Sequence, residues 1–177
     1  MEPSIEKRSI NRGFNILKKK KNLLYYDAWS NGETGYPLVD ASIICLKNTG
    51  YLNFRMRSMI VSFLTHHLWQ PWQLSSYFLA RNFLDFEPGI HYSQLQMQAA
   101  ETGVNTIRIY NPTKNAYEKD KEGIFIKKWL PILKNIPIPL LFEPWKMSKI
   151  EQTLYNCNID KDYPKPIVDI SITRKFA

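Results

Sequence analysis

Two arginines and two acids are the side chains whose types and spacing most suggest chemistry. Arg55 and Arg57 lie two residues apart, and Asp85 and Glu87 flank Phe86 in an apolar context. Carboxylates in such a context need partners, because an unpaired buried charge is too costly to keep. One interpretation is that this acidic corner presents acceptors and main-chain N–H groups to the polar edge of a ring-shaped ligand. The alternative is that the charges pair with one another or lie at the surface, and spacing alone leaves both open.

Histidines provide a second set of candidates. His91 stands beside Tyr92 on an expected helix, where a lone histidine is more often hydrogen-bonded packing than a ligand or base. His66 and His67 are adjacent, so their side chains diverge on a helix, and no carboxylate stands at metal-ligand spacing. We therefore predict no metal site. The sequence also has no G-x-S-x-G, Walker or G-x-G-x-x-G motif, so it predicts neither a serine nucleophile nor a phosphate loop.

Helical periodicity dominates the elements that must position these residues. A first long helix starts at Pro37 and stops at Gly50. Asp85 to Gly89 forms a tight corner with two acids and two helix breakers. Further helices are expected from about residue 52 to Pro71 and over 72–84, 90–101 and 123–133, with a short amphipathic stretch at 22–32, an extended segment at 107–112 and a short helix around 146–154. We predict an all-α helical bundle with a Pro-rich, irregular C-terminal tail packed over it.

Composition limits the class of protein. A chain of 177 residues with 44% apolar and 14% aromatic residues suits one domain and excludes disordered and fibrous classes. Lys and Arg (24) exceed Asp and Glu (16) by eight, a balance that favours anionic partners such as nucleic acid or acidic lipid. Residues 7–21 carry seven of these cations and no acid, so we predict a solvated, mobile basic arm over 1–21 and a folded domain over 22–177.

The cell compartment is inferred from cysteine usage and hydropathy. Cys45 and Cys157 lie far apart in sequence, and the start of the chain lacks the apolar core of a signal peptide. The longest stretch without formal charge, residues 58–80, is too polar for a membrane span. The expectations are free thiols, a cytoplasmic location and no membrane association.

A series of short sequence tags follows in order along the chain. The tags are Gly35-Tyr36-Pro37-Leu38-Val39-Asp40-Ala41, Thr49-Gly50, Arg55-x-Arg57, Val61-Ser62-Phe63-Leu64, Leu84-Asp85-x-Glu87, Tyr110-Asn111-Pro112, Trp129-Leu130-Pro131, Glu143-Pro144-Trp145 and Tyr163-Pro164-x-Pro166-Ile167-Val168. Each tag alone is common, whereas their order and spacing together are highly specific. Taken in order, they resemble the flavin-binding helical domain of DNA photolyases and cryptochromes, and the resemblance runs from about Trp29 to Val168.

The resemblance implies FAD held among helices and excited by blue light, with DNA as the partner. It implies that Arg57 salt-bridges Asp85 beside the isoalloxazine ring, with Glu87 at the second acidic position of the flavin edge. His91 falls where the family places the residue facing flavin N5, and an imidazole there could donate to N5 or supply its proton.

Three further positions are carried over from the same resemblance. Arg55 and Arg108 match arginines that contact phosphates flanking a DNA lesion. Trp72 matches the middle tryptophan of the chain that photoreduces the flavin, and so becomes a candidate electron relay.

Departures from the family pattern divide the functional hypotheses. Complete members are more than twice as long, with an amino-terminal α/β domain and a segment that grips the FAD diphosphate. The proximal and surface redox tryptophans correspond to Leu95 and Lys19, and the tryptophan that stacks on the lesion corresponds to Met97. Nearby, a methionine corresponds to Ser58 and an asparagine to Phe54.

Three hypotheses therefore stand. One is a photolyase-like lyase, or the carboxy-terminal part of a split one that needs a second polypeptide. Another is a non-catalytic, cryptochrome-like module that binds DNA or protein, and the third is a truncated gene product that retains only the fold.

Overall fold

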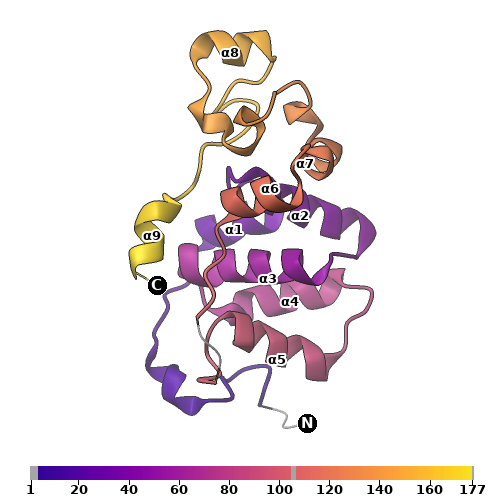
Figure 1. Ribbon diagram of the computed structural model, residues 1–177. Coiled ribbons are helices and arrows are strands. Elements are labelled where there is room, and N and C mark those ends of the chain that lie inside the picture. The colour runs from indigo at the N-terminus through magenta and orange to yellow at the C-terminus, as the bar shows by residue number, and fades with distance from the viewer. Residues whose placement is uncertain (1–3, 105–106, 177) are drawn as a thin grey trace.

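Helices make up all the regular structure of residues 4–104 and 107–176, which the computed structural model describes (Figure 1). The prediction of an all-α fold is confirmed. The α-helices are α1 (Leu23–Asn31), α2 (Pro37–Thr49), α3 (Phe54–Ser62), α4 (Trp72–Asn82), α5 (Pro88–Gln98), α6 (Pro112–Lys119), α7 (Ile124–Trp129), α8 (Lys149–Leu154) and α9 (Ile170–Phe176). The shorter turns are a π-helical turn, η2 (Phe63–His67), and four 3-10 turns, η1 (Arg12–Ile16), η3 (Pro131–Leu133), η4 (Leu140–Phe142) and η5 (Pro144–Lys146). Across the described ranges, no helix is both long and apolar enough to cross a membrane.

Local capping chemistry sets the ends of the helices near the start of the domain. Pro37 occupies the first turn of α2, and Gly50 ends it in the left-handed conformation. Asn53 caps α3 by accepting a hydrogen bond from the backbone N–H of Met56, so this helix begins at Phe54 rather than at Leu52.

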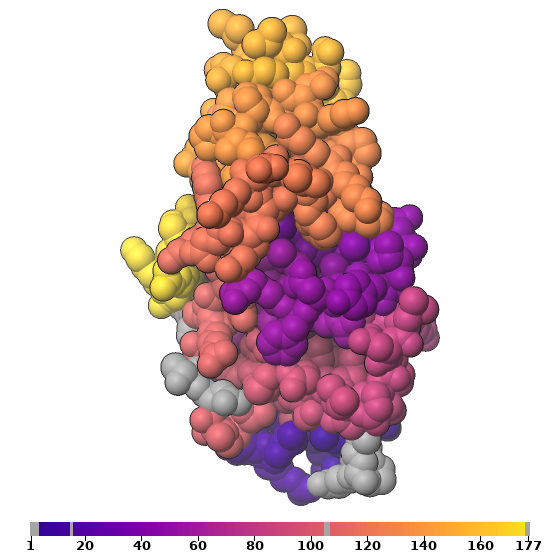
Figure 2. Space-filling model, turned by 45° about the vertical axis from the view of Figure 1, so that its right-hand side comes forward, coloured from indigo at the N-terminus to yellow at the C-terminus, as the bar shows by residue number. Residues whose placement is uncertain are grey.

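The helices are stacked in layers around α2. This helix packs against α1, α3, α6 and α7, and α5 packs against α3 and α4 at the other end of the stack (Figure 1). The C-terminal segment, orange and yellow, forms a narrower mass over the α2 end of the molecule (Figure 2). The predicted Pro-rich tail is therefore packed onto the bundle.

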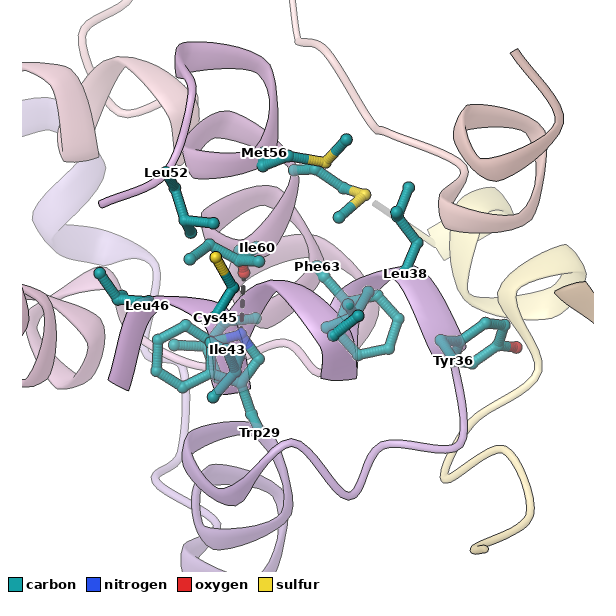
Figure 3. Close-up of a cluster of buried hydrophobic side chains, with 14 of the residues drawn as sticks. Trp29, Tyr36, Leu38, Ile43, Cys45, Leu46, Leu52, Met56, Ile60 and Phe63 are labelled. Carbon is teal, nitrogen blue, oxygen red and sulfur yellow. Dashed lines mark hydrogen bonds between the residues drawn. The ribbon is translucent and has the colours of Figure 1, made fainter. Parts of the chain in front are cut away.

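The core lies between α1, α2 and α3. Trp29, Ile43 and Phe63 are fully buried there, and Figure 3 shows their side chains converging with those of the neighbouring helices. The indole Nε1 of Trp29 donates to the backbone oxygen of Ile60 at 2.9 Å. This bond satisfies the one polar atom of the indole, so the ring can be buried without an unpaired donor.

A buried carboxylate ties the start of α2 to the C-terminal tail. Asp40 accepts hydrogen bonds from the hydroxyl and N–H of Thr34, from the N–H of Gly35 and from the hydroxyl of Tyr163 at 2.5 Å. Burial raises the pKa of Asp40 to about 6, and the donors oppose that rise. Gly35 has a φ of 79°, and a Cβ there would lie 2.3 Å from the backbone oxygen of Lys165. Only glycine allows this close approach.

The basic arm departs from the expectation of a solvated segment. Ser9 is buried and its hydroxyl donates to Glu101 at 2.5 Å. The Lys19 side chain is only 4% exposed, and its Nζ lies 3.7 Å from the same carboxylate. The prediction is wrong at these two positions because their partner lies more than 80 residues further along the chain, where no local pattern can indicate it.

Several helix boundaries also differ from the prediction. Helices α6 and α9 were not expected, and Pro112 opens α6 rather than ending an extended segment. The helix expected over 123–133 ends at Trp129, because Pro131 begins a separate 3-10 turn. The helix expected from residue 90 starts at Pro88, whose fixed φ suits a first helical turn.

Candidate functional site

A cavity of about 300 Å³ lies between α3, the end of α4, the acidic corner and α5. Its walls are mainly aromatic and aliphatic, with a few polar groups among them, which is the usual composition of a small-molecule site. The lining residues are Phe54, Arg57, Ser58, Val61, Leu79, Phe83, Asp85, Phe86, Glu87, Ile90, His91, Gln94, Leu95 and Gln98. The structure thus brings together four of the predicted site residues, Arg57, Asp85, Glu87 and His91.

The acidic corner is held in place by the end of α2. The backbone N–H of Leu84 donates to the oxygen of Gly50 at 3.1 Å. A Cβ on Gly50 would lie 2.5 Å from Cγ of Leu84, and the φ of this glycine is 70°. The glycine that ends α2 therefore also allows Leu84, the residue just before the acidic corner, to lie close to the end of that helix.

Arg57 and Asp85 form the predicted ion pair, with Nη2 and Oδ2 2.9 Å apart. The Nε of Arg57 donates to the backbone oxygen of Leu52 at 2.7 Å, and its guanidinium lies 4.1 Å from the ring centroid of Phe83. These contacts fix the guanidinium at the cavity wall. The hydrogen bond from Arg57 lowers the pKa of Asp85 below its ordinary value, so the carboxylate is charged at neutral pH.

Glu87 is the N-cap of α5. Its Oε2 accepts a hydrogen bond from the backbone N–H of Ile90 at 2.7 Å. A carboxylate at this position also interacts favourably with the positive end of the helix dipole. Glu87 therefore lines the cavity while one of its oxygens holds the start of the helix that carries His91.

His91 is buried at the cavity wall, with its ring in edge contact with Phe86 at a centroid distance of 5.0 Å. Its Nε2 lies 3.0 Å from the backbone oxygen of Ser76. Since that oxygen can only accept, Nε2 carries a proton, and Nδ1 of the neutral ring is an acceptor. Burial, with the nearby charge of Arg57, lowers the pKa of His91. From the sequence, His91 was expected to be able to donate a proton to its ligand. Because Nε2 already donates to Ser76, donation from Nδ1 would require the doubly protonated imidazolium, which the lowered pKa of His91 disfavours.

Gln94 is a cavity residue that sequence reasoning missed. Its Oε1 is buried without a hydrogen-bond partner, although a buried amide oxygen usually has one. Gln94 stands three residues after His91 on α5, so helical spacing placed it near the same surface. That spacing was the only available signal, because a glutamine carries no distinctive pattern of its own.

Trp72 is fully buried and lies outside the cavity lining. Its Nε1 donates to Oε2 of Glu101 at 3.1 Å and lies 3.4 Å from Oγ of Ser9. Leu95, which lines the cavity, stands on α5, the helix that packs against the α4 helix of Trp72. The predicted relay therefore stands on a helix that packs against α5 but does not itself line the cavity.

The two predicted phosphate contacts lie along α3. Arg55 is exposed near the start of this helix. Arg108 is exposed too, and its backbone oxygen accepts a hydrogen bond from Ser62 at the end of the helix. With a rise of about 1.5 Å per residue, Arg55 and Ser62, the residue that bonds Arg108, are roughly 10 Å apart along the axis of α3.

The remaining candidates have structural partners. Nε2 of His66 lies 3.0 Å from the backbone oxygen of Gln98, and His67 contacts the Thr173 hydroxyl at 2.8 Å and the Tyr110 oxygen at 2.9 Å. Among the described residues, no group of His, Cys, Asp and Glu could hold a metal ion. Cys45 and Cys157 are both free and buried.

These features define the class of protein as an all-helical ligand-binding domain. Its helices form the walls of a small cavity, and a charged pair lies at the edge of that cavity. The chain belongs to the family of the FAD binding domain of DNA photolyase, whose profile matches residues 1–177. The resemblance drawn from the sequence tags is therefore confirmed, and FAD is the cofactor of this family.

Relatives include both photolyases and cryptochromes. A deoxyribodipyrimidine photo-lyase of Alkalihalophilus pseudofirmus is 37% identical over 179 residues, covering 99% of this chain and 37% of the relative. The structure of a class III photolyase from Agrobacterium tumefaciens has a TM-score of 0.93 at 26% identity, covering 99% of this chain and 37% of that one. A Synechocystis cryptochrome has a TM-score of 0.88 at 27% identity, covering 94% and 34% respectively. The chain thus spans little more than a third of the length of these proteins.

Proposed function

We propose that this chain forms part of the flavin site of a photolyase-like flavoprotein, with the cavity as the seat of the isoalloxazine ring of FAD. The observation that carries the proposal is the Arg57–Asp85 pair at the wall of an apolar cavity. Exposed ion pairs contribute only about 0–1 kcal/mol to stability, so stability alone gives little reason to hold this one by several contacts. The unpartnered Oε1 of Gln94 supports the same assignment, since the ring of a flavin offers an N–H donor.

The residues of the cavity divide the work of holding the ring. Arg57 provides a fixed positive charge, and Asp85 provides a carboxylate that stays ionised. His91 provides an acceptor nitrogen in its neutral form, and Glu87 fixes the helix that positions it. FAD, when bound, supplies the light-driven electron transfer. Arg55 on α3 and Arg108, whose backbone oxygen is bonded to Ser62 at the end of that helix, are both exposed and would contact the phosphates of DNA.

The size of the cavity indicates that it takes the ring and not the whole cofactor. A volume of about 300 Å³ is at the lower end of the range for ligand sites, roughly 300–1,000 Å³. Phe54, Leu84 and Ile90 are 63%, 85% and 64% exposed around it. Such an apolar surface suits a covering segment. We propose that the rest of a family-length protein, in this or a second polypeptide, covers the surface and grips the diphosphate.

Flavin titration tests the seat of the ring. Riboflavin and FAD are added to the purified chain, and binding is followed by flavin fluorescence quenching. Arg57→Gln should weaken riboflavin binding by roughly 10- to 100-fold, the usual effect of losing a hydrogen bond to a charged group. Arg81→Gln removes the same charge from an exposed position of α4 and serves as the control. Equal losses in the two variants, or no riboflavin binding by the wild-type chain, would contradict the proposed seat.

Light-driven DNA repair is the finer form of the proposal, and a non-catalytic DNA- or protein-binding module is the alternative. Leu95 in the cavity wall favours the alternative, because the resemblance expects a redox tryptophan there and leucine cannot relay an electron. Illumination of the flavin-loaded protein with DNA containing thymine dimers separates the two. Light-dependent loss of dimers supports a lyase, whereas retention of DNA without repair supports the module. The cytoplasmic location stays a prediction.

A further inference from the structure

A groove of about 760 Å³ lies on the surface where the N-terminal arm crosses the end of η2. We call it the lysine groove, and it is defined by Lys18, Lys20, Lys21, Asn22, Leu23, Leu24, Tyr25, Leu68, Trp69 and Gln70. It shares no lining residue with the cavity proposed for the flavin. None of its lining residues is acidic.

The arm segment that carries the lysines is held to the body at two points, one within the lysine run and one directly after it. The backbone N–H of Asn22 donates to Oε1 of the buried Gln70 at 2.7 Å. Nζ of Lys19 donates to the backbone oxygen of Thr65 at 3.1 Å and lies 3.7 Å from Glu101. The lysine groove is thus largely preformed, and a ligand would not have to order this backbone.

Lys19 differs from its three lysine neighbours, Lys18, Lys20 and Lys21, in the direction of its side chain. The side chain of Lys19 points inward to a charge partner, whereas the other three are exposed. Within the described ranges, these three lysines have no ion pair. Three unneutralised cations beside an acid-free groove attract an anionic ligand.

Trp69 provides the second, independent observation. Its φ is 53°, a left-handed conformation that glycine adopts freely and that costs other residues of order 1–3 kcal/mol. The residue is nevertheless 43% exposed, so full burial of the indole does not account for the strain. Nζ of Lys19 lies 4.7 Å from the ring centroid. Trp69 is also a lining residue of the lysine groove, so its exposed part is available to a ligand there.

We propose that the lysine groove binds single-stranded nucleic acid, with a base stacked on Trp69 and the backbone phosphates on Lys18, Lys20 and Lys21. An aromatic platform combined with a positive track is the usual means of holding a single strand without sequence preference. A duplex would not fit this arrangement, because its bases are already stacked on one another and cannot reach the indole. This contact is separate from the α3 arginines and does not depend on the flavin.

Fluorescence anisotropy with a dye-labelled oligothymidylate tests the proposal on the full chain. Lys18→Gln, Lys20→Gln and Lys21→Gln combined should reduce the slope of log affinity against log salt by about 2, measured between about 50 and about 200 mM salt. The control combines Lys47→Gln, Lys121→Gln and Lys134→Gln, which remove the same charge from exposed positions outside the groove. The control slope should stay close to that of the wild type.

Trp69→Gly separates stacking from folding. Glycine suits the left-handed backbone, which offsets part of the lost packing of the indole, so the variant should still unfold cooperatively. Affinity for the oligothymidylate should fall roughly 5- to 100-fold, the equivalent of one lost base stack. Affinity for a strand of the same length made of abasic sites should not change, since it offers no base to stack.

Three results would overturn the proposal. The first is an oligothymidylate affinity that Trp69→Gly leaves unchanged in a folded protein. The second is an equal loss of slope in the two lysine triples, which would reduce the effect to net charge. The third is that the triple Lys18→Gln, Lys20→Gln and Lys21→Gln variant weakens binding of a duplex of the same length, or of vesicles of acidic lipid, as much as binding of the oligothymidylate, which would indicate a general anion surface.

Discussion

Acid should destabilise this fold through His66, and the size of the effect follows from its burial. The ring is 5% exposed, and its Nε2 lies 3.0 Å from the backbone oxygen of Gln98, the last residue of α5. Burial lowers the pKa of His66 from 6.5 to about 4. In the unfolded chain this histidine takes up its proton near pH 6.5, whereas in the folded chain it stays neutral until about pH 4. Stability is therefore lost as the pH falls through this window.

The magnitude is worked from the two pKa values. Each pH unit between them corresponds to about 1.4 kcal/mol. Relative to neutral pH, His66 should cost about 2 kcal/mol at about pH 5 and about 3 kcal/mol below pH 4. Lowered pKa values of His67 and His91 act in the same direction, and the raised pKa of Asp40 acts in the opposite one. The contribution of His66 is therefore measured as a difference between proteins.

Urea unfolding of the wild type and His66→Gln, at about pH 7.5 and about pH 5, measures this difference. Glutamine can still donate to the oxygen of Gln98 but does not titrate. The variant should become about 2 kcal/mol more stable relative to the wild type on going to the lower pH. Ser75→Ala, which removes a buried hydroxyl that does not titrate, should give the same offset at both values. An offset for His66→Gln that does not depend on pH would refute the reasoning.

Three further substitutions test the packing that positions the site. Tyr163→Phe removes a donor to the buried carboxylate of Asp40 and should lower the free energy of unfolding by about 1.5–3 kcal/mol in urea titrations. Gly35→Ala places a Cβ 2.3 Å from a backbone oxygen of the tail, so calorimetry should show loss of the cooperative transition or a large fall in its midpoint. Trp29→Phe leaves a gap in the core and removes the bond to Ile60, and should cost about 1–3 kcal/mol, measured by chemical unfolding. An unchanged stability in any of the three would contradict the contact concerned.

Elements with strong local signals were predictable from the sequence. The start of α2 at Pro37 and its end at Gly50 depend on backbone preferences that each residue carries with it. The ion pair between Arg57 and Asp85 came from the resemblance, and the structure shows the two groups 2.9 Å apart. Apolar periodicity indicated α3 as a helix but not how deeply it is buried, since Ser58 and Ser62 are buried along with its apolar residues.

Contacts between distant segments were not predictable. Ser9 and Lys19 looked like parts of a solvated arm because their shared partner, Glu101, lies beyond five α-helices. The polar composition of α6 gave no apolar stripe, so only its cap at Asn111 marked it. Gln94 could not be singled out, since what distinguishes it is an oxygen without a partner, a property of the packed structure alone.

The N-terminal arm and the wall of the cavity depend on one another through the end of α5. This helix contributes His91 and Gln94 to the cavity. Glu101, three residues after the last residue of the helix, contacts Lys19 of the arm. Trp72 of α4 donates to the same carboxylate, so one buried acid holds both helices that back the cavity. Removing a partner from such a buried pair is costly, because the remaining charge is left without compensation. The arm is therefore a structural part of the domain, and the lysine groove is built on the same contact that steadies the proposed flavin site.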